Sequence, residues 1–193
     1  MKRRKFIKSM TALGTGLLLR PFSANPQQPP AAANPHIKRV LVMFKCHFDA
    51  GFIDTQAAVV HKYFTEYFPR AIQLAAAQRA SGHRYIWTTG SWLLYEYLEQ
   101  ASSEDRKRME HAIHQGDIAW HALPFSWQTE LLDQSMIAGA LSLSKSLDHR
   151  FGRTTTGAKM TDVPGHTRGI VAPLSANGVK FLDIGGNSAC TPA

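Results

Sequence analysis

A regular alternation of short apolar segments with amphipathic segments constrains the fold of this chain more than any other feature. Five apolar segments have the length and composition of buried strands, at 38–46, 84–88, 117–121, 155–161 and 179–184. Helical patterns lie between them, at about 54–80, 91–100, 102–116, 129–149 and 166–177. Strands alternating with helices form parallel β-α-β units with right-handed crossovers. The sequence therefore predicts an α/β fold with a site at the carboxyl ends of the strands.

Several helix boundaries carry their own end signals. Asp54 can cap the first helix, Pro69 predicts a kink within it, and Gly82 predicts its end. Ser102, followed by Asp105 three positions later, resembles a capping box. These signals depend only on neighbouring residues, so they predict helix ends without knowledge of the tertiary fold.

The first 33 residues have the pattern of a targeting segment. Basic residues at 2–8 precede an apolar run at 10–19 that is too short for a transmembrane helix. The basic segment resembles a twin-arginine export signal, with an ordinary secretory signal as the alternative. A Pro-rich linker and Ala31-Ala32-Ala33, a possible cleavage site, follow. We therefore predict a signal and linker at 1–33, a folded domain at 34–193, and an exported protein, periplasmic or secreted, with no stable membrane anchor.

The basic charge of the chain is concentrated in this segment. The formal net charge is +8, but it falls to +2 without the six basic residues at positions 2, 3, 4, 5, 8 and 20. No basic stripe interleaved with aromatic residues remains, so nucleic acid is not an expected partner. Two cysteines are too few for a disulfide scaffold. Composition therefore points to an ordinary globular domain.

Candidate metal ligands stand at the ends of two expected strands. His47 and Asp49 follow the first strand two positions apart, so they are expected on one side of the chain. Asp162 follows the fourth strand, and the carboxyl ends of parallel strands meet at one edge of a sheet. Imidazole and carboxylate ligands suit zinc. The alternatives are that Asp162 caps a helix and that His47 is a hydrogen-bonded core histidine.

Three segments resemble one family of enzymes. Residues 47–51 (HFDAG) and 162–167 (DVPGHT) are similar to the H-x-D-x-G-W and D-P-F-G-H-S motifs of the catalytic domain of glycoside hydrolase family 38, the α-mannosidases. With residues 120–126 (WHALPFS), the resemblance is closer to a bacterial branch of that superfamily, domain-of-unknown-function family 5054. It covers roughly residues 38–186.

This resemblance implies a seven-stranded β/α barrel of the glycoside hydrolase and deacetylase type that binds one zinc ion. His47, Asp49 and Asp162 would be the metal ligands, and Asp162 would also be the nucleophile of a retaining mechanism. The family's fourth ligand and general acid come from later sequence. We therefore expect this chain to be the N-terminal part of the barrel, incomplete with about five strands and with poor catalytic competence alone.

Four further residues are candidates for substrate contacts. Phe52 replaces the family's tryptophan after the first motif and keeps an apolar stacking face. His121 ends the third expected strand and either faces the site or hydrogen-bonds to the backbone. Trp127, which follows a strand end, is a candidate for sugar stacking, together with Phe125. His166 matches the histidine of the second motif and would shape the site.

The expected function is that of an exported, zinc-dependent, α-mannosidase-like hydrolase acting on carbohydrate. Its expected partners are the carbohydrate substrate and the twin-arginine export machinery. A metal-dependent carbohydrate deacetylase remains an alternative, because it uses similar strand-end ligands to activate water. A non-catalytic carbohydrate-binding protein is a third possibility.

Overall fold

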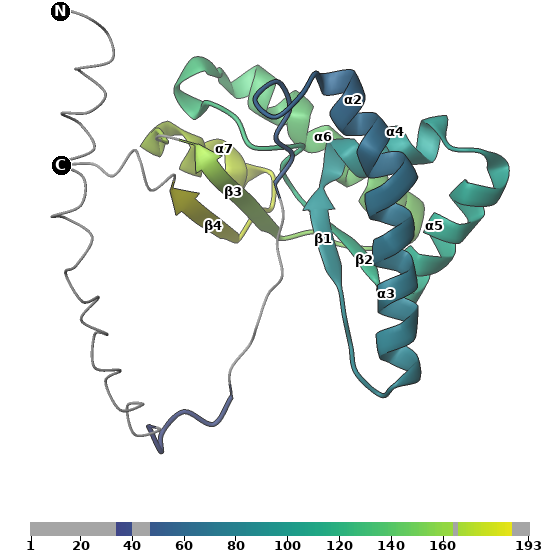
Figure 1. Cartoon of the computed structure of the whole chain (residues 1–193). Helices are drawn as coiled ribbons and strands as arrows, with labels where there is room; N and C mark the ends of the chain where they lie inside the picture. Colours follow the sequence, from purple (N-terminus) through teal and green to yellow (C-terminus); the bar gives the residue numbers. More distant parts are fainter. Residues whose placement is uncertain (1–33, 40–46, 164–165, 187–193) are drawn as a thin grey trace, which may run out of the picture. The chain divides into compact units, whose positions relative to one another are not determined.

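The structure, a computed structural model, describes residues 34–39, 47–163 and 166–186 (Figure 1). The chain divides into two compact units, residues 1–42 and 43–193. In the first unit, the described residues form a turn in which the Ile37 amide donates to the Asn34 carbonyl at 3.0 Å. The predicted signal and linker, and most of the first predicted strand, lie outside the described residues. No helix in the described part of the chain is long and apolar enough to cross a membrane.

Helices and parallel strands alternate along the second unit. In chain order its elements are α2 (Gln56–Lys62), the π-helical turn η1 (Tyr63–Tyr67), α3 (Phe68–Ala80), β1 (Trp87–Gly90), α4 (Ser91–Gln100), α5 (Ser103–Gln115), β2 (Ile118–His121), the 3-10 turn η2 (Thr129–Leu131), α6 (Gln134–Phe151), β3 (Gly157–Val163), the 3-10 turn η3 (Arg168–Ile170), α7 (Val171–Ala176) and β4 (Phe181–Gly186). The predicted α/β class is therefore confirmed.

Local hydrogen bonds from side chains set the start of three of the helices. Thr55, and not Asp54, caps α2, because the Thr55 hydroxyl accepts from the Ala58 amide at 3.3 Å. Ser102 caps α5 as predicted, and its hydroxyl accepts from the Asp105 amide at 3.1 Å. The helix expected from about residue 129 begins later, at the Asp133 cap, after the short turn η2.

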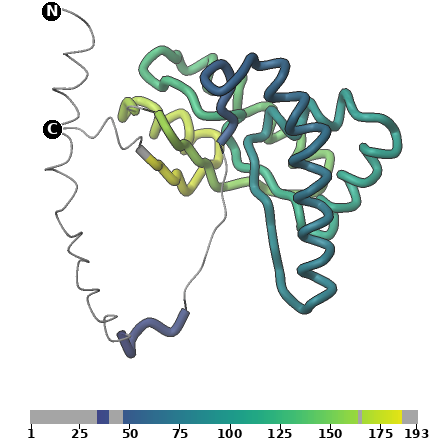
Figure 2. Tube along the Cα trace, in the orientation of Figure 1, coloured from purple at the N-terminus to yellow at the C-terminus, as the bar shows by residue number. Residues whose placement is uncertain are grey.

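A π-helical turn interrupts the first long helix just before Pro69. Proline lacks an amide hydrogen, and Pro69 lies in the first turn of α3, where no intrahelical donor is required. The irregularity predicted at Pro69 therefore falls in the preceding turn. After α3 the chain turns at Gly82 and runs back beside the helix into β1 (Figure 2).

The strands are adjacent in the order in which they occur along the chain. β1 pairs in parallel with β2, with Gly90 opposite His121. β3 pairs in parallel with β4, with Lys159 opposite Asp183. The Ala122 amide donates to the Gly157 carbonyl at 2.8 Å and places the end of β2 beside the start of β3. Within the described residues these strands do not close into a barrel.

Two apolar clusters connect the strands to the helices. One contains Ile118 and Trp120 of β2 with side chains of α3, α4 and α5. The other contains Ala158 and Met160 of β3 with side chains of α6 and α7. Because side chains alternate along a strand, His121 lies on the opposite face of β2 from the helices. The two faces of the strands therefore differ in character, one covered by helices and the other carrying polar groups.

Candidate functional site

The structure brings together His47 and Asp162, two of the three predicted metal ligands. The His47 Nε2 atom lies 3.4 Å from the Asp162 Oδ2 atom, and both side chains are partly exposed. His47 precedes α2, whereas Asp162 lies near the end of β3. The contact therefore joins two segments that are far apart in the sequence, at the edge where a parallel sheet is expected to carry its site.

Asp162 has an unusual backbone conformation. Its φ angle is +63°, and it is the only non-glycine residue with a positive φ in the described part of the chain. It also interrupts the pairing of β3 with β4, whose register shifts between Thr161 and Val163. Such conformations cost about 1–3 kcal/mol, and bulges commonly redirect side chains beside functional sites. Asp162 thus occupies a strained position from which its carboxylate reaches His47.

The alternative that Asp162 is only a helix cap is wrong. Asp162 belongs to β3, and Thr167 caps the following turn η3 by accepting from the Gly169 amide at 3.2 Å. The residue that caps this turn is therefore Thr167.

The distance between His47 and Asp162 fits two ligands of one metal ion. Donor atoms that lie about 2.0–2.1 Å from a tetrahedral zinc ion are separated by about 3.3 Å. The observed 3.4 Å agrees with this separation and is longer than a strong hydrogen bond. Imidazole nitrogen and carboxylate oxygen are also ordinary zinc donors. The pair therefore fits the expected ion in both distance and chemistry.

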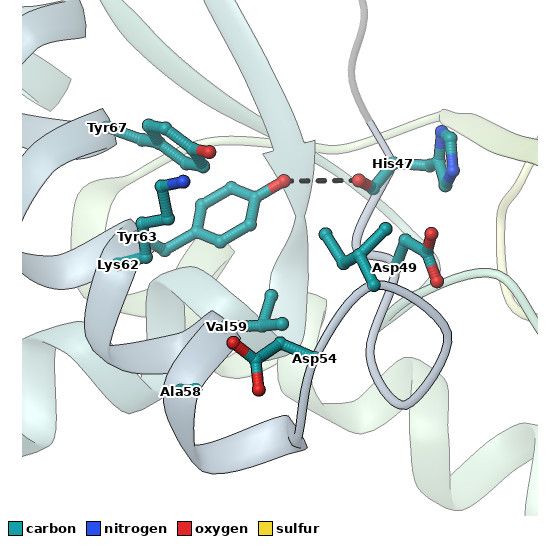
Figure 3. A pocket seen from close by; sticks show the side chains of 9 residues that line it. His47, Asp49, Asp54, Ala58, Val59, Lys62, Tyr63 and Tyr67 are labelled. Carbon is teal, nitrogen blue, oxygen red and sulfur yellow. Dashed lines mark hydrogen bonds between the residues drawn. The ribbon is translucent and has the colours of Figure 1, made fainter.

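Asp49, the third predicted ligand, lies in the same loop as His47 but does not complete a cluster. Among the described residues, no group of three His, Cys, Asp or Glu side chains is placed to hold a metal ion. Figure 3 shows the His47 and Asp49 side chains directed to the same side of the loop, as expected for residues two apart in extended chain. The structure thus brings two of the predicted ligands together and leaves the third in the same loop as His47.

A pocket of about 380 Å³ adjoins this loop. It lies between the loop and the first turns of the long helix (Figure 3), and its lining consists of His47, Asp49, Ile53, Asp54, Ala58, Val59, Lys62, Tyr63 and Tyr67. Two carboxylates, one ammonium group and two phenol rings give it the mixture of polar and aromatic groups that recognises a hydroxylated ligand.

The π-helical turn fixes the wall of the pocket. The buried Tyr63 side chain donates from its hydroxyl to the His47 carbonyl at 3.1 Å, a bond drawn in Figure 3. Tyr63 and Tyr67 pack edge to face at 5.0 Å, and the Lys62 ammonium lies 5.5 Å from the centre of the Tyr67 ring. A hydrogen bond with Tyr67 raises the pKa of Lys62. The turn therefore positions the backbone of His47 directly.

Aromatic side chains form a row from the π-helical turn to the loop after β2. The ring centres of successive pairs lie 5.9 Å apart for Tyr63 and Phe48, 5.4 Å for Phe48 and Trp92, 5.9 Å for Trp92 and Phe125, and 6.1 Å for Phe125 and Trp127. Phe125 and Trp127, predicted as stacking residues, therefore belong to a longer row of packed aromatic rings.

Close backbone packing holds the loop after β2 against the end of β1. The Ser91 amide donates to the Leu123 carbonyl at 3.0 Å. A Cβ atom at Gly90 would lie 2.1 Å from the Pro124 carbonyl oxygen, so only glycine fits there. The carboxyl ends of β1 and β2 are thus joined by direct main-chain contact.

His121 is buried at the end of β2. Only 8% of its surface is exposed, and its Nδ1 atom has no hydrogen-bond partner in the described structure. Burial, followed by repulsion from the Lys159 ammonium, lowers the pKa of His121 to about 4. The imidazole is therefore neutral near pH 7. The predicted substrate contact and the alternative bond to the backbone both stay predictions.

The remaining predicted substrate residues differ in exposure. Phe52 is 90% exposed and does not line the pocket, whereas its neighbour Ile53 does. Trp127 is partly buried against the cluster beneath α6. His166 follows β3, and both of its ring nitrogens are buried without a partner in the described structure.

Some residues of the site were not predicted from the sequence. Tyr63 and Trp92 lie at helical spacing, which is typical of core residues, and nothing local marks the Tyr63 bond to His47. Phe48 lies between two predicted ligands in the sequence. The only signal for its packing was that alternate residues of an extended chain point to opposite sides.

Comparison with known proteins gives no match to this chain among family models, curated proteins or solved structures.

Proposed function

We propose that this chain forms part of an exported, zinc-dependent, α-mannosidase-like glycoside hydrolase. The observation that carries the proposal is the approach of His47 to Asp162, 3.4 Å apart with Asp162 in a strained conformation. The motifs that resemble family 38 contain both of these residues. The pocket and the aromatic row beside them supply surfaces on which a sugar can bind.

We further propose that the strands belong to a β/α barrel of the seven-stranded type. Three features support this assignment. The paired strands are neighbours in chain order, and both pairs are parallel. The helices of each apolar cluster pack on the face of the strands that carries Ile118 in β2 and Met160 in β3. In a barrel the opposite face is the interior, which would place His121 and Lys159 there.

Each residue of the site has a distinct role in the proposed reaction. The Asp162 carboxylate attacks the anomeric carbon, and the glycosidic carbon–oxygen bond breaks as the glycosyl ester forms. The leaving oxygen takes a proton from a general acid, for which the resemblance assigns no residue of this chain. His47 and Asp49, with Asp162, would hold zinc, which when bound supplies Lewis-acid polarisation and orients sugar hydroxyls.

The proposed localisation is the periplasm or the exterior, reached through the twin-arginine pathway. Its support is the basic and apolar pattern of residues 2–19. Substitution of both Arg3 and Arg4 by lysine should retain the protein in the cytoplasm if this pathway is used, whereas unchanged export would contradict the assignment.

Metal analysis and hydrolysis together test the proposed activity. The purified chain should contain about one equivalent of zinc, and His47→Ala and Asp162→Ala should each remove most of it. In a longer chain that also carries the general acid, turnover of an aryl α-mannoside should be lost in Asp162→Ala. Asp54→Asn is the matched control, because Asp54 lines the same pocket and is not a proposed ligand. Retained turnover in Asp162→Ala would exclude Asp162 as the nucleophile.

The same assays separate the alternatives. A carbohydrate deacetylase would release acetate from an acetylated sugar without cleaving the aryl glycoside. A non-catalytic binding protein would do neither, and its zinc content would stay well below one equivalent.

A further inference from the structure

Buried polar atoms without partners occur in the loop after β2, at the end of β3 and just after it. They are the Trp127 Nε1 atom, the Thr161 Oγ1 atom and both ring nitrogens of His166, judged within the described structure. Proteins leave few buried polar atoms unpaired, because each loses its hydrogen bonds to water on folding. Several such atoms together indicate a site for a group that hydrogen-bonds to them.

Two hydrogen bonds place these atoms in adjacent segments. The Ser126 hydroxyl accepts from the Thr161 amide at 3.3 Å, and the Thr129 hydroxyl accepts from the Thr167 amide at 2.9 Å. Residues 126 and 129 therefore lie beside residues 161 and 167. Trp127 lies between the two accepting residues on one segment, and Thr161 and His166 lie on the other.

Packing fixes the orientation of these groups. Trp127 packs edge to face on Phe125 at 6.1 Å and against the apolar cluster beneath α6. Thr129, which anchors the other end of the loop segment, is fully buried. The Trp127 indole is therefore held by packing, and each of the unpaired atoms is itself buried.

The chemistry of these groups matches a neutral, hydroxylated ligand. The Trp127 indole only donates, the Thr161 hydroxyl donates and accepts, and the two His166 ring nitrogens donate or accept. A sugar hydroxyl likewise donates and accepts, whereas a carboxylate or phosphate only accepts and would leave the acceptors unpaired. None of these residues is a proposed zinc ligand.

We propose that Trp127, Thr161 and His166 form a metal-independent subsite for a neutral sugar unit of the substrate. The choice of a sugar rests on the proposed function, but the existence of the subsite rests on the unpaired atoms alone. The site adjoins Asp162 in sequence, so it would bind a unit next to the reacting bond.

Binding of methyl α-mannoside in the presence of EDTA tests the subsite, measured by NMR on the purified chain. Thr161→Val removes the hydroxyl with little change in shape. It should weaken binding about fivefold, the effect of one hydrogen bond. It should leave the melting temperature unchanged or higher, because the lost hydroxyl had no partner in the free protein.

Thr155→Val is the matched control. The Thr155 hydroxyl donates to Asp148 at 2.6 Å, before the start of β3 and away from the subsite. This variant should lower the melting temperature and leave binding unchanged. Trp127→Phe, which keeps a ring but loses the indole donor, should again weaken binding.

Three results would overturn the subsite. The first is that methyl α-mannoside does not bind the wild-type chain. The second is that Thr161→Val and Trp127→Phe both bind it as well as the wild type does. The third is that Thr161→Val has a lower melting temperature and unchanged binding. The last would show that the hydroxyl bonds an internal water. Sugar binding in EDTA by a chain that binds no zinc would contradict the proposed function only, and zinc binding by a chain that binds no sugar would contradict the subsite only.

Discussion

Buried His121 should make the stability of this protein depend on pH above the range where carboxylates titrate. The pKa of His121 is lowered from 6.5 to about 4 in the folded chain, so the unfolded chain binds more protons between these values. Stability contributed by neutral His121 is therefore present above about pH 6.5 and is lost as the pH falls toward 4. The ammonium group of Lys159 adds to this effect by repelling the protonated ring.

The structure sets the size of the effect. Each unit of pKa shift corresponds to about 1.4 kcal/mol, so the full shift is worth about 3 kcal/mol. Between about pH 7.5 and pH 5 the linkage relation gives a loss of about 2 kcal/mol from this residue. His121 is 8% exposed, so solvent screens the effect little.

Urea denaturation of the wild-type chain and of His121→Gln at the two pH values measures this loss. The wild type should lose about 2 kcal/mol more than the variant, because glutamine does not titrate. Other groups contribute equally to both proteins and cancel in the difference. Parallel losses in the two proteins, or an NMR titration of His121 near pH 6.5, would refute the reasoning.

Two further predictions follow from single contacts. Gly90→Ala should destabilise the chain by about 3 kcal/mol or more in thermal unfolding, because the new Cβ would meet the Pro124 carbonyl. Gly139→Ala is the control: its Cβ would lie in open space on a helix, so it should stabilise the chain by about 1 kcal/mol. Tyr63→Phe should lower the free energy of unfolding by about 1 kcal/mol and weaken zinc binding measured by calorimetry, because it removes the hydrogen bond to the His47 carbonyl. Tyr67→Phe is the control for this variant. Equal zinc affinity in the wild type and both variants would contradict a positioning role for Tyr63.

Local sequence predicts the helices of this chain well where a short-range hydrogen bond decides them. Helix α4 spans Ser91–Gln100, as predicted, and α5 begins after the Ser102 cap. Gly116 ends α5 with a φ of +78°, a conformation that glycine adopts without strain. Strand β1 is less predictable: it lies at 87–90 instead of 84–88, because pairing with β2 decides its limits.

The candidate site was predictable in its residue types but not in its geometry. The sequence predicts that His47 and Asp162 stand at strand ends and are candidates for one metal site. It does not predict that Asp162 adopts a positive φ within a bulge, because that conformation depends on the pairing of β3 with β4. The aromatic row was likewise not predictable from the sequence, because its members come from four separate segments.

The sequence by itself thus determined the class of fold, the Ser102 cap of α5 and the positions of the chemical groups. These properties depend on periodicity and on hydrogen bonds between residues a few positions apart. The tertiary structure decided the 3.4 Å approach of His47 to Asp162, the burial of His121 and the need for glycine at position 90. Each of these depends on contacts between segments that the chain brings together only after the strands and helices have packed.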